Sequence, residues 1–243
     1  MTSDATERRV VRVDVVLPVY NEEEALADSV TTLHEFLAEH CPYDWRIVIA
    51  DNASTDSTWA TAQALAERFP RVTPFHLDQK GRGRALRQAW TASDADVVSY
   101  MDVDLSTGLE AFMPMIDAIA KEDYEIAVGS RLMPESNVTR GPKREFISRC
   151  YNLLIKLMFW HHFSDAQCGF KAVSRRVVQE LIPLVQDQAW FFDSELLLLA
   201  ERKGYPIKDI PVTWVDDPGS TVNVIDTAWK DFKGLVRMRF SRV

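Results

Sequence analysis

Strand-like and helix-like segments alternate through the first half of the chain, and this alternation limits the fold more than any other feature. Short runs rich in apolar and β-branched residues are each followed by a longer segment of helical character. Strands separated by helices of this length predict βαβ units and a parallel sheet covered on both faces. The expected strands are 10–19, 45–50, 72–77, 96–101 and 124–128.

Helix caps and breakers place the remaining elements. Asn21 is expected to cap a helix over 22–40, and Ser54, Thr55 and Asp56 offer caps for a helix that Pro70 ends. A short helix should reach about residue 92, and another should lie between the last two of these strands. The second half is predicted to contain helices at 140–163, 174–185, 194–202 and 227–240 and a strand at 207–215. With no repeat or linker, we expect one domain over 1–243.

Composition excludes several classes of protein. The 243 residues are 47% hydrophobic and 26% charged, as in an ordinary globular chain, and the net charge of −8 argues against broad nucleic-acid binding. The three cysteines lie far apart and predict neither a zinc site nor a disulfide framework. The first residues lack the apolar core of a signal peptide, and no run approaches the roughly 20 apolar residues that span a bilayer. We therefore expect a protein that does not cross a membrane but is able to lie against one.

Polar side chains follow three of the expected strands. Asn21 and Glu22 follow the first, Asp51 and Asn52 the second, and Asp102 and Asp104 the fourth. Ligands of open α/β sheets bind beyond the carboxyl ends of the strands. A single aspartate after a strand is commonly a helix cap, but three such groups at one edge indicate a shared site.

Asp102 and Asp104 are two carboxylates one residue apart, and such a pair indicates a metal-binding site. Their paired negative charge is costly unless a cation neutralises it, and Mg²⁺ or Mn²⁺ prefers carboxylates together with substrate phosphates. Such pairs also occur on solvated turns. The prediction of a metal site therefore depends on the buried strand that precedes this pair. The basic loop at 79–84 has two readings, a solvated turn or an anion-binding helix start.

Four motifs, in this order and spacing, resemble family-2 glycosyltransferases with the GT-A (Rossmann-like) fold, a mostly parallel sheet with helices on both faces. They are 17–22 (LPVYNE), 51–58 (DNASTDST), 80–85 (KGRGRA) and 102–104 (DVD). The subgroup that transfers sugars to polyprenyl (dolichyl) phosphate looks most similar. Its marks are 129–131 (GSR), 165–171 (DAQCGFK), 192–195 (FDSE) and 210–214 (IPVTW). Residues 143–171 and 214–220 resemble dolichyl-phosphate glucosyltransferases more than mannose synthases, which favours a UDP-sugar over GDP-mannose.

The resemblance implies roles for individual residues. The nucleotide-binding half, 1–130, would use Pro18, Tyr20, Glu22, Asp51, Lys80, Gly81 and Asp102. Asp102 and Asp104 would hold Mg²⁺ or Mn²⁺, and with Arg131 they form the expected catalytic set. Arg131, Arg144 and Ser148 would bind the acceptor phosphate. Asp165, Gln167 and Glu195 would form the sugar pocket, with a loop-stabilising network as the alternative for these residues, Glu195 above all. Two departures from relatives are Asn52, where an aspartate is common, and Ser106, where mannose synthases carry a glutamine near the metal.

The acceptor half, 131–243, contains two segments in which apolar and basic residues mix. One covers 153–160, and the other combines Trp229, Phe232, Leu235, Val236 and Phe240 with Lys230, Lys233, Arg237, Arg239 and Arg242. Such helices are often core, but the pattern also suits C-terminal amphipathic helices at a membrane surface. We expect a peripheral protein on the cytoplasmic face of a membrane that transfers the sugar by direct, inverting displacement.

Four other functions remain open from the sequence: a GDP-mannose-dependent polyprenyl-phosphate mannose synthase, a family-2 enzyme with a polysaccharide acceptor, a silent sugar-nucleotide sensor, and a nucleotidyltransferase. The Gln-x-x-Arg-Trp signature of processive polysaccharide enzymes is not found in the sequence. The intact Asp102 and Asp104 argue against the sensor. Release of pyrophosphate would identify a nucleotidyltransferase.

Overall fold

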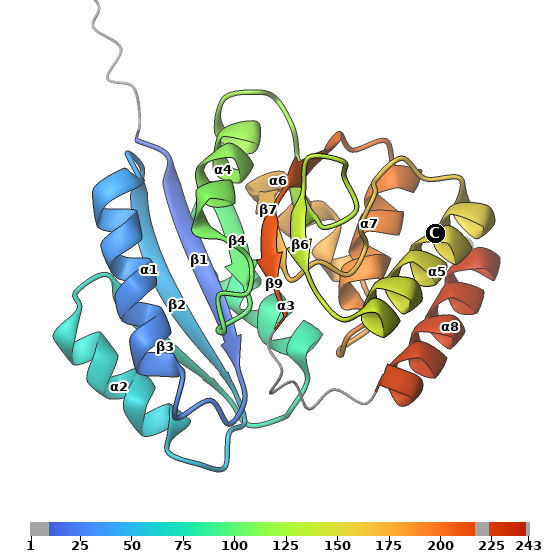
Figure 1. Ribbon diagram of the computed structural model, residues 1–243. Helices are drawn as coiled ribbons and strands as arrows, with labels where there is room; N and C mark the ends of the chain where they lie inside the picture. The colour runs from blue at the N-terminus through green and yellow to red at the C-terminus, as the bar shows by residue number, and fades with distance from the viewer. Residues whose placement is uncertain (1–9, 217–223, 242–243) are drawn as a thin grey trace, which may run out of the picture.

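A seven-stranded sheet forms the centre of the computed structural model, which describes residues 10–216 and 224–241, the side chains of 143–144 and 224–228 excepted (Figure 1). The strand order is β3-β2-β1-β4-β7-β5-β8. These strands are β1 (Arg12–Val19), β2 (Asp44–Asn52), β3 (Val72–Leu77), β4 (Val97–Met101), β5 (Ile126–Ser130), β7 (Phe170–Ser174) and β8 (Ile207–Pro211). A separate parallel pair consists of β6 (Asn137–Thr139) and β9 (Thr213–Val215).

Helices pack on both faces of the sheet, because its strands are apolar on both sides. Along β1, Val13, Val15 and Leu17 join one buried cluster and Val16 joins the other. The first cluster lies under α1 (Leu26–His40), α2 (Thr58–Arg68) and α4 (Phe112–Ala120). The second contacts α3 (Arg82–Ala92), α5 (Pro142–Phe159), α6 (Arg175–Glu180), α7 (Phe192–Arg202) and α8 (Val224–Phe240). The prediction of a mostly parallel sheet with two helical layers is confirmed.

One strand of the sheet, β7, was not predicted. It runs antiparallel between β4 and β5 and pairs with both. Its side chains alternate between the two clusters, with Phe170 and Ala172 in one and Val173 in the other. A fully buried lysine, Lys171, interrupts the apolar pattern, which is why the run does not read as a strand.

Two local predictions were wrong. Asn21 does not cap α1, which begins at Leu26 after Ala25; Asn21 has a positive φ of 56°, and its side-chain oxygen accepts a hydrogen bond from the N–H of Thr55 at 2.8 Å. The single strand expected over 207–215 is split, and only β8 belongs to the main sheet. Pro211 has no N–H for a further ladder bond, and the chain beyond it pairs with β6 instead.

A close contact between α3 and α7 predicts a stability effect at Gly83. A Cβ added there would lie 2.6 Å from Cβ of Phe192 and 3.0 Å from the carbonyl oxygen of Ala189. Gly83→Ala should therefore force the two helices apart and lower the free energy of unfolding in urea by about 1–3 kcal/mol, although alanine favours a helix. Gln88→Ala on the exposed side of α3 is the control and should change it by less than about 0.5 kcal/mol. Equal stability of the two variants would contradict this packing argument.

Candidate active site

The residues expected to bind substrates lie at the edge of the sheet where β1, β2 and β4 end. Because β7 runs antiparallel, it begins at this edge, with Phe170 opposite Met101 of β4. The N–H of Asp102 donates to the carbonyl oxygen of Gly169 at 3.2 Å. The loop before β7 is therefore in contact with the acidic pair after β4, although more than 60 residues separate them in sequence.

On the side of this edge that β1 and β2 form, Asp51 is completely buried. One of its carboxylate oxygens lies 2.7 Å from Nδ1 of His76, and the other accepts from the N–H of Ser54 at 3.3 Å. The neighbouring Asn52 accepts a hydrogen bond from the N–H of Gly81 at 2.6 Å. The asparagine that departs from the family pattern thus anchors the basic loop to the end of β2.

The other expected nucleotide contacts surround Asp51. Pro18 lies on β1, which pairs with β2 up to Val19 opposite Asp51. Nζ of Lys80 lies 3.4 Å from the ring centroid of Tyr20, so the basic loop and the end of β1 meet directly. The backbone N–H of Glu22 donates to a hydroxyl at the start of α2. The structure therefore brings the predicted nucleotide-binding residues of β1, β2 and the loop into one neighbourhood.

The two carboxylates of the acidic pair have different surroundings. Oδ1 of Asp102 accepts a hydrogen bond from Arg82 at 2.8 Å, and its side chain is 45% exposed. Asp104 is exposed, and its Oδ1 accepts from the N–H of Ser106 at 2.9 Å. Val103 between them is buried. Both carboxylates thus keep an open side at the edge of the sheet.

These carboxylates fit a hard divalent cation that shares its ligands with a substrate. They offer oxygen atoms, which Mg²⁺ and Mn²⁺ prefer. Within residues 10–216 and 224–241, no group of three or more His, Cys, Asp or Glu side chains is placed to hold a metal ion. The remaining ligands of such an ion would have to come from water and the diphosphate of a nucleotide.

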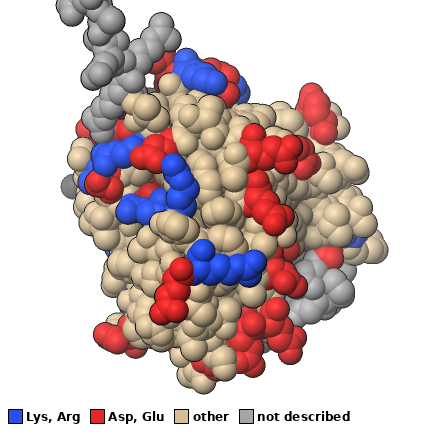
Figure 2. Space-filling view, turned by 90° about the vertical axis from the view of Figure 1, so that its left-hand side faces the viewer, with Lys and Arg blue, Asp and Glu red and all other residues tan. Residues whose placement is uncertain are grey.

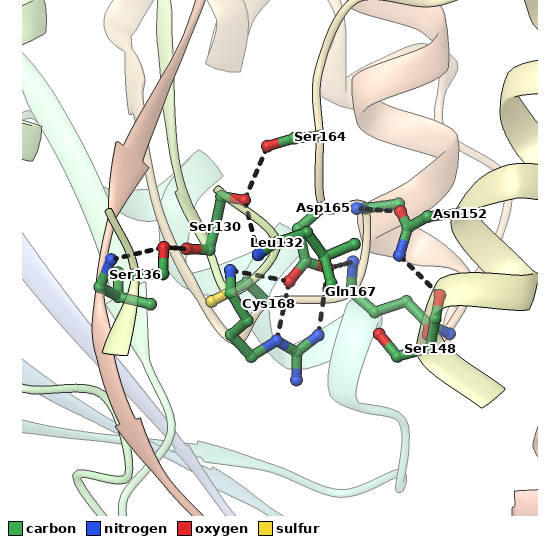
Figure 3. Close-up of polar contacts among 12 residues, drawn as sticks. Ser130, Leu132, Ser136, Ser148, Asn152, Ser164, Asp165, Gln167 and Cys168 are labelled. Atoms are coloured by element: carbon green, nitrogen blue, oxygen red, sulfur yellow. Dashed lines mark hydrogen bonds and ion pairs between the residues drawn. The ribbon is translucent and has the colours of Figure 1, made fainter. Parts of the chain in front are cut away.

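Arg131, which follows β5, is paired with Asp165. Its Nε and Nη2 lie 2.8 and 3.1 Å from the two carboxylate oxygens, and its N–H also donates to Asp165 (Figure 3). Burial alone would raise the pKa of Asp165, but the guanidinium lowers that pKa to about 2. Asp165 therefore holds Arg131 in place, and both of its oxygens are occupied by these contacts and by the N–H of Gln167.

The other residues expected at the acceptor phosphate lie on α5. Ser148 is buried, and its hydroxyl has no hydrogen-bond partner among the described residues. Figure 3 shows it on the helix face toward the loop that contains Gln167. The side chain of Arg144 lies outside the described residues. A cavity of about 450 Å³ opens beside Arg131 and is also lined by Met133, Ser136, Val138, Glu145 and Arg149.

The last two residues of the expected sugar pocket contact α8. Nε2 of Gln167 donates to Asp231 at 2.9 Å, and burial raises the pKa of Asp231 to about 7. Glu195 is buried and accepts from both terminal nitrogens of Arg237, at 2.8 and 2.9 Å. Among the residues that the structure describes, no hydrogen bond or ion pair joins Glu195 to Asp165. The network that was the alternative for Glu195 is present, and its role in a sugar pocket stays a prediction.

Three residues of this region, two of them buried and the third nearly so, were not predicted as site residues. Arg82, Lys171 and Asp193 form ion pairs behind Asp102. Lys171 and Asp193 were noted only as letters of family motifs, and Arg82 only as such a letter and as part of the basic loop at 79–84, which had two readings. Their signal was the presence of charged residues inside segments that are otherwise buried, since buried charges need partners.

Comparison with known proteins now identifies the family. Residues 14–182 match the family described as glycosyl transferase family 2. The chain belongs to this family. The enzyme class predicted from the sequence, a glycosyltransferase, is confirmed.

Relatives of this glycosyltransferase match most of its length. It is 35% identical over 217 residues to "Glycosyltransferase AglD" of Haloferax volcanii, and the match covers 88% of the chain but only 35% of that protein. It is 29% identical over 247 residues to the dolichyl-phosphate beta-glucosyltransferase of Saccharomyces cerevisiae, covering 93% of the chain and 74% of the relative. The chain thus spans about a third of the archaeal relative and three quarters of the yeast one.

Solved structures show the same fold. The glucosyl-3-phosphoglycerate synthase of Mycobacterium tuberculosis, in a complex with Mn²⁺, UDP and glucosyl-3-phosphoglycerate, matches with a TM-score of 0.71. The match has 16% sequence identity and covers 94% of this chain and 80% of that one. The predicted GT-A fold of the glycosyltransferase is therefore confirmed.

The contact between Gly169 and Asp102 predicts a variant that folds but transfers sugar more slowly. A Cβ at position 169 would lie 1.8 Å from Oδ2 of Asp102, so this half-exposed carboxylate would have to turn away from its contact with Arg82. Gly169→Ala should keep the midpoint of thermal unfolding within about 5 °C and lower the rate of sugar transfer by about tenfold or more. Gly141→Ala, where a Cβ would meet nothing within 4 Å, is the matched control. Full activity of Gly169→Ala would show that the orientation of Asp102 does not matter.

Proposed function

We propose that this glycosyltransferase transfers a sugar from a nucleotide sugar, with a UDP-sugar favoured, to the phosphate of a polyprenyl phosphate. The observation that carries the proposal is the contact between the loop before β7 and Asp102, because the same loop holds Arg131 through Asp165. The loop before β7 thereby contacts both Asp102, a carboxylate suited to the donor site, and Arg131, a cation suited to binding an acceptor phosphate. The names of the yeast relative and of several others, dolichyl-phosphate beta-glucosyltransferase, support this acceptor.

The first half of the chain, residues 1–130, would bind the donor. Pro18, Tyr20 and Glu22 would line the nucleoside pocket, and the buried carboxylate of Asp51 would accept hydrogen bonds from the base. Lys80 and the N–H groups at the start of α3 would face the phosphates. Crystals of a structural neighbour contain UDP-glucose and Mn²⁺, which supports a donor of this class in this fold.

The acidic pair would hold the cation that stabilises the leaving group. Asp102 and Asp104 would hold Mg²⁺ or Mn²⁺, which supplies Lewis-acid stabilisation of the negative charge on the departing nucleoside diphosphate. Two protein carboxylates are too few to complete an octahedral shell, so the diphosphate oxygens would be ligands as well. This arrangement explains why the described residues contain no larger cluster of acidic, cysteine and histidine side chains.

The second half, residues 131–243, would bind the acceptor. A terminal phosphate with a second pKa of about 6 is largely dianionic at neutral pH, so it attacks without a strong general base. Arg131 and the hydroxyl of Ser148, which has no hydrogen-bond partner among the described side chains, would hold it, with Arg144 as the third predicted ligand. Direct displacement would invert the anomeric carbon. Gln167, Asp165 and Glu195 would complete the sugar pocket. Asp165 would contribute by holding Arg131 in place.

A membrane surface would present the lipid acceptor to α5 and α8, which lie side by side (Figure 1). Large apolar side chains are exposed on both helices: Phe146, Leu153 and Leu157 on α5, Trp160 at its end, and Trp229, Phe232, Val236 and Phe240 on α8. The described helices include none that is both long and apolar enough to span a bilayer. Leu235 is buried and Arg237 is paired with Glu195, so neither belongs to this surface as predicted, and Arg242 lies outside the described residues.

Basic side chains on α8 would strengthen attraction to anionic lipids. Lys233 and Arg239 are exposed on this helix between the apolar residues. Figure 2 shows the other side of the molecule, nearer α1 and α2, where acidic and basic side chains are interspersed. The apolar and basic face of α5 and α8 therefore differs from that side in the kind of surface that it offers.

Replacement of Asp104 tests the proposed chemistry. Asp104→Asn keeps the size of the side chain but removes its charge, so transfer from UDP-glucose to a short-chain polyprenyl phosphate in Mn²⁺ should fall by about a hundredfold or more. Labelled UDP- and GDP-sugars are compared for wild type and variant, and released UDP is separated from pyrophosphate. Asp44→Asn, at the far end of β2, is the control.

Three results would contradict the proposal in different ways. Unchanged transfer by Asp104→Asn would remove the role of the metal. Transfer only from GDP-mannose would identify a mannose synthase. An α-linked product from an α-linked donor would exclude a single displacement.

Vesicle binding tests the membrane surface. Trp229 and Phe232 stack with centroids 5.9 Å apart and are exposed, so their replacement by serine removes apolar area without opening the core. Wild type should co-sediment with anionic vesicles, less so at high salt, and Trp229→Ser/Phe232→Ser should bind about tenfold more weakly. Transfer to a water-soluble short-chain acceptor should stay near wild type. Val10→Ser, exposed near the other end of the chain, is the control, and equal vesicle binding by the double variant would exclude α8 as the contact.

A further inference from the structure

The guanidinium of Arg82 is nearly buried behind the acidic pair. Its Nη2 lies 2.8 Å from Oδ1 of Asp102, and its Nη1 lies 2.6 Å from Oδ2 of Asp193. Only 10% of the side chain is exposed. Arg82 is therefore an internal partner of two carboxylates and not the solvated arginine of one of the two readings of the basic loop.

A second cation completes this buried cluster. Lys171 on β7 is fully buried, and its Nζ lies 3.2 Å from Oδ1 of Asp193. Nζ also donates to the carbonyl oxygen of Cys168 at 2.6 Å, and the hydroxyl of Tyr100 donates to Asp193. Burial alone would raise the pKa of Asp193, but the two cations hold that pKa below its usual value. Asp193 is thus an ionised carboxylate shared between Lys171 and Arg82.

Aromatic rings and the backbone restrict the position of Arg82. Its Cζ lies 4.8 Å from the ring centroid of Tyr100 and 5.1 Å from that of Trp190. The residue before it, Gly81, is held to the end of β2 by Asn52. A guanidinium fixed in this way presents a constant charge and a constant direction to Asp102.

The charges of the four side chains alternate from the core to the edge. Lys171 is followed by Asp193, Arg82 and Asp102, so two positive and two negative groups balance. A divalent cation at Asp102 would meet a carboxylate whose charge Arg82 already compensates. The attraction of such a cation to the nucleotide-free protein would be reduced, because the guanidinium of Arg82 would repel the cation at short range.

We infer that Arg82 is a positioning residue that orients Asp102 and compensates its charge, so that the divalent cation binds tightly only together with the nucleoside diphosphate. Lys171 and Asp193 hold Arg82 in this place. The inference rests on the proposed function, because it takes Asp102 as a metal ligand. It adds to that function that metal binding and donor binding depend on each other. The diphosphate would supply the negative charge that Asp102, compensated by Arg82, does not offer to the metal.

Binding of Mn²⁺ to the whole chain, followed by the electron paramagnetic resonance signal of free Mn²⁺, tests the inference without any turnover. Wild type should bind Mn²⁺ weakly alone and at least about tenfold more tightly with UDP. Arg82→Gln removes the positive charge and should tighten nucleotide-free Mn²⁺ binding by about tenfold, while kcat of sugar transfer falls. A merely structural residue would not improve metal binding when it is replaced.

A charge-conserving variant separates charge from geometry. Arg82→Lys keeps the positive charge but cannot contact both carboxylates with one fork, so Mn²⁺ binding without nucleotide should stay within about twofold of wild type while kcat falls. Arg176→Gln is the matched control at an exposed ion pair on α6 and should match wild type in both measurements. Tightening by Arg82→Lys as large as that by Arg82→Gln would overturn the role of the charge.

Two results distinguish this inference from the proposed function. No Mn²⁺ binding by wild type, even with UDP, would refute the proposed metal-dependent function itself. Equal Mn²⁺ affinity of wild type with and without UDP would overturn the inference alone, and this comparison decides even if Arg82→Gln does not fold. Unchanged or weaker nucleotide-free binding by a folded Arg82→Gln would overturn it as well.

Discussion

The hydrogen-bond ladder that inserts β7 between β4 and β5 determines most of the site. An antiparallel strand in this position begins where its two neighbours end, so residues 165–169 reach the same edge as Asp102 and Arg131. Had the segment been added at the outside of the sheet, Asp102 and Arg131, which we propose to serve the donor and the acceptor, would have had no common support. The close approach also requires Gly169, because any larger residue would occupy the space of the Asp102 carboxylate.

Paired burial of charge is the second constraint. Removing an ion from water costs several kcal/mol, and the cost is offset only when a partner with good geometry is buried with it. This chain buries Asp165 with Arg131, Asp193 with Arg82 and Lys171, and Glu195 with Arg237. Each of these pairs joins two elements that are distant in sequence. The pairs therefore restrict where the reacting groups lie relative to one another, whatever their net contribution to stability.

The sequence predicted those parts of the molecule that depend on local patterns. Runs of β-branched residues gave the strands of the first half, and the positions of Asp51 and Asp102 followed from where those strands end. It did not predict β7, because Lys171 breaks the apolar run and its partner Asp193 is 22 residues away. Ion pairs between residues so far apart in sequence depend on how the elements pack. No rule of sequence spacing predicts them.

Asn21 and Arg82 show the same limit at the level of single residues. Asn21 matches the composition of a helix cap, but its positive φ turns it toward Thr55 and α1 begins only at Leu26. Arg82 matches an anion-binding loop, but the aromatic rings beside it and Asp193 behind it draw its side chain inward. In both cases the residue type suits two roles, and the tertiary partner selects one.

Contacts of α8 connect its exposed apolar side chains with the edge of the sheet where Asp102 and Arg131 lie. Asp231 accepts from Gln167 in the loop before β7, and Arg237 pairs with Glu195 on α7, two residues after Asp193. The helix with exposed Trp229 and Phe232 is therefore packed against both segments that support Asp102. A lipid held on that helix would carry its phosphate to a position fixed relative to Arg131, because the helix, the loop and the arginine share one set of polar contacts. The long acceptor tail and the small reacting phosphate then require no separate mechanism to be aligned.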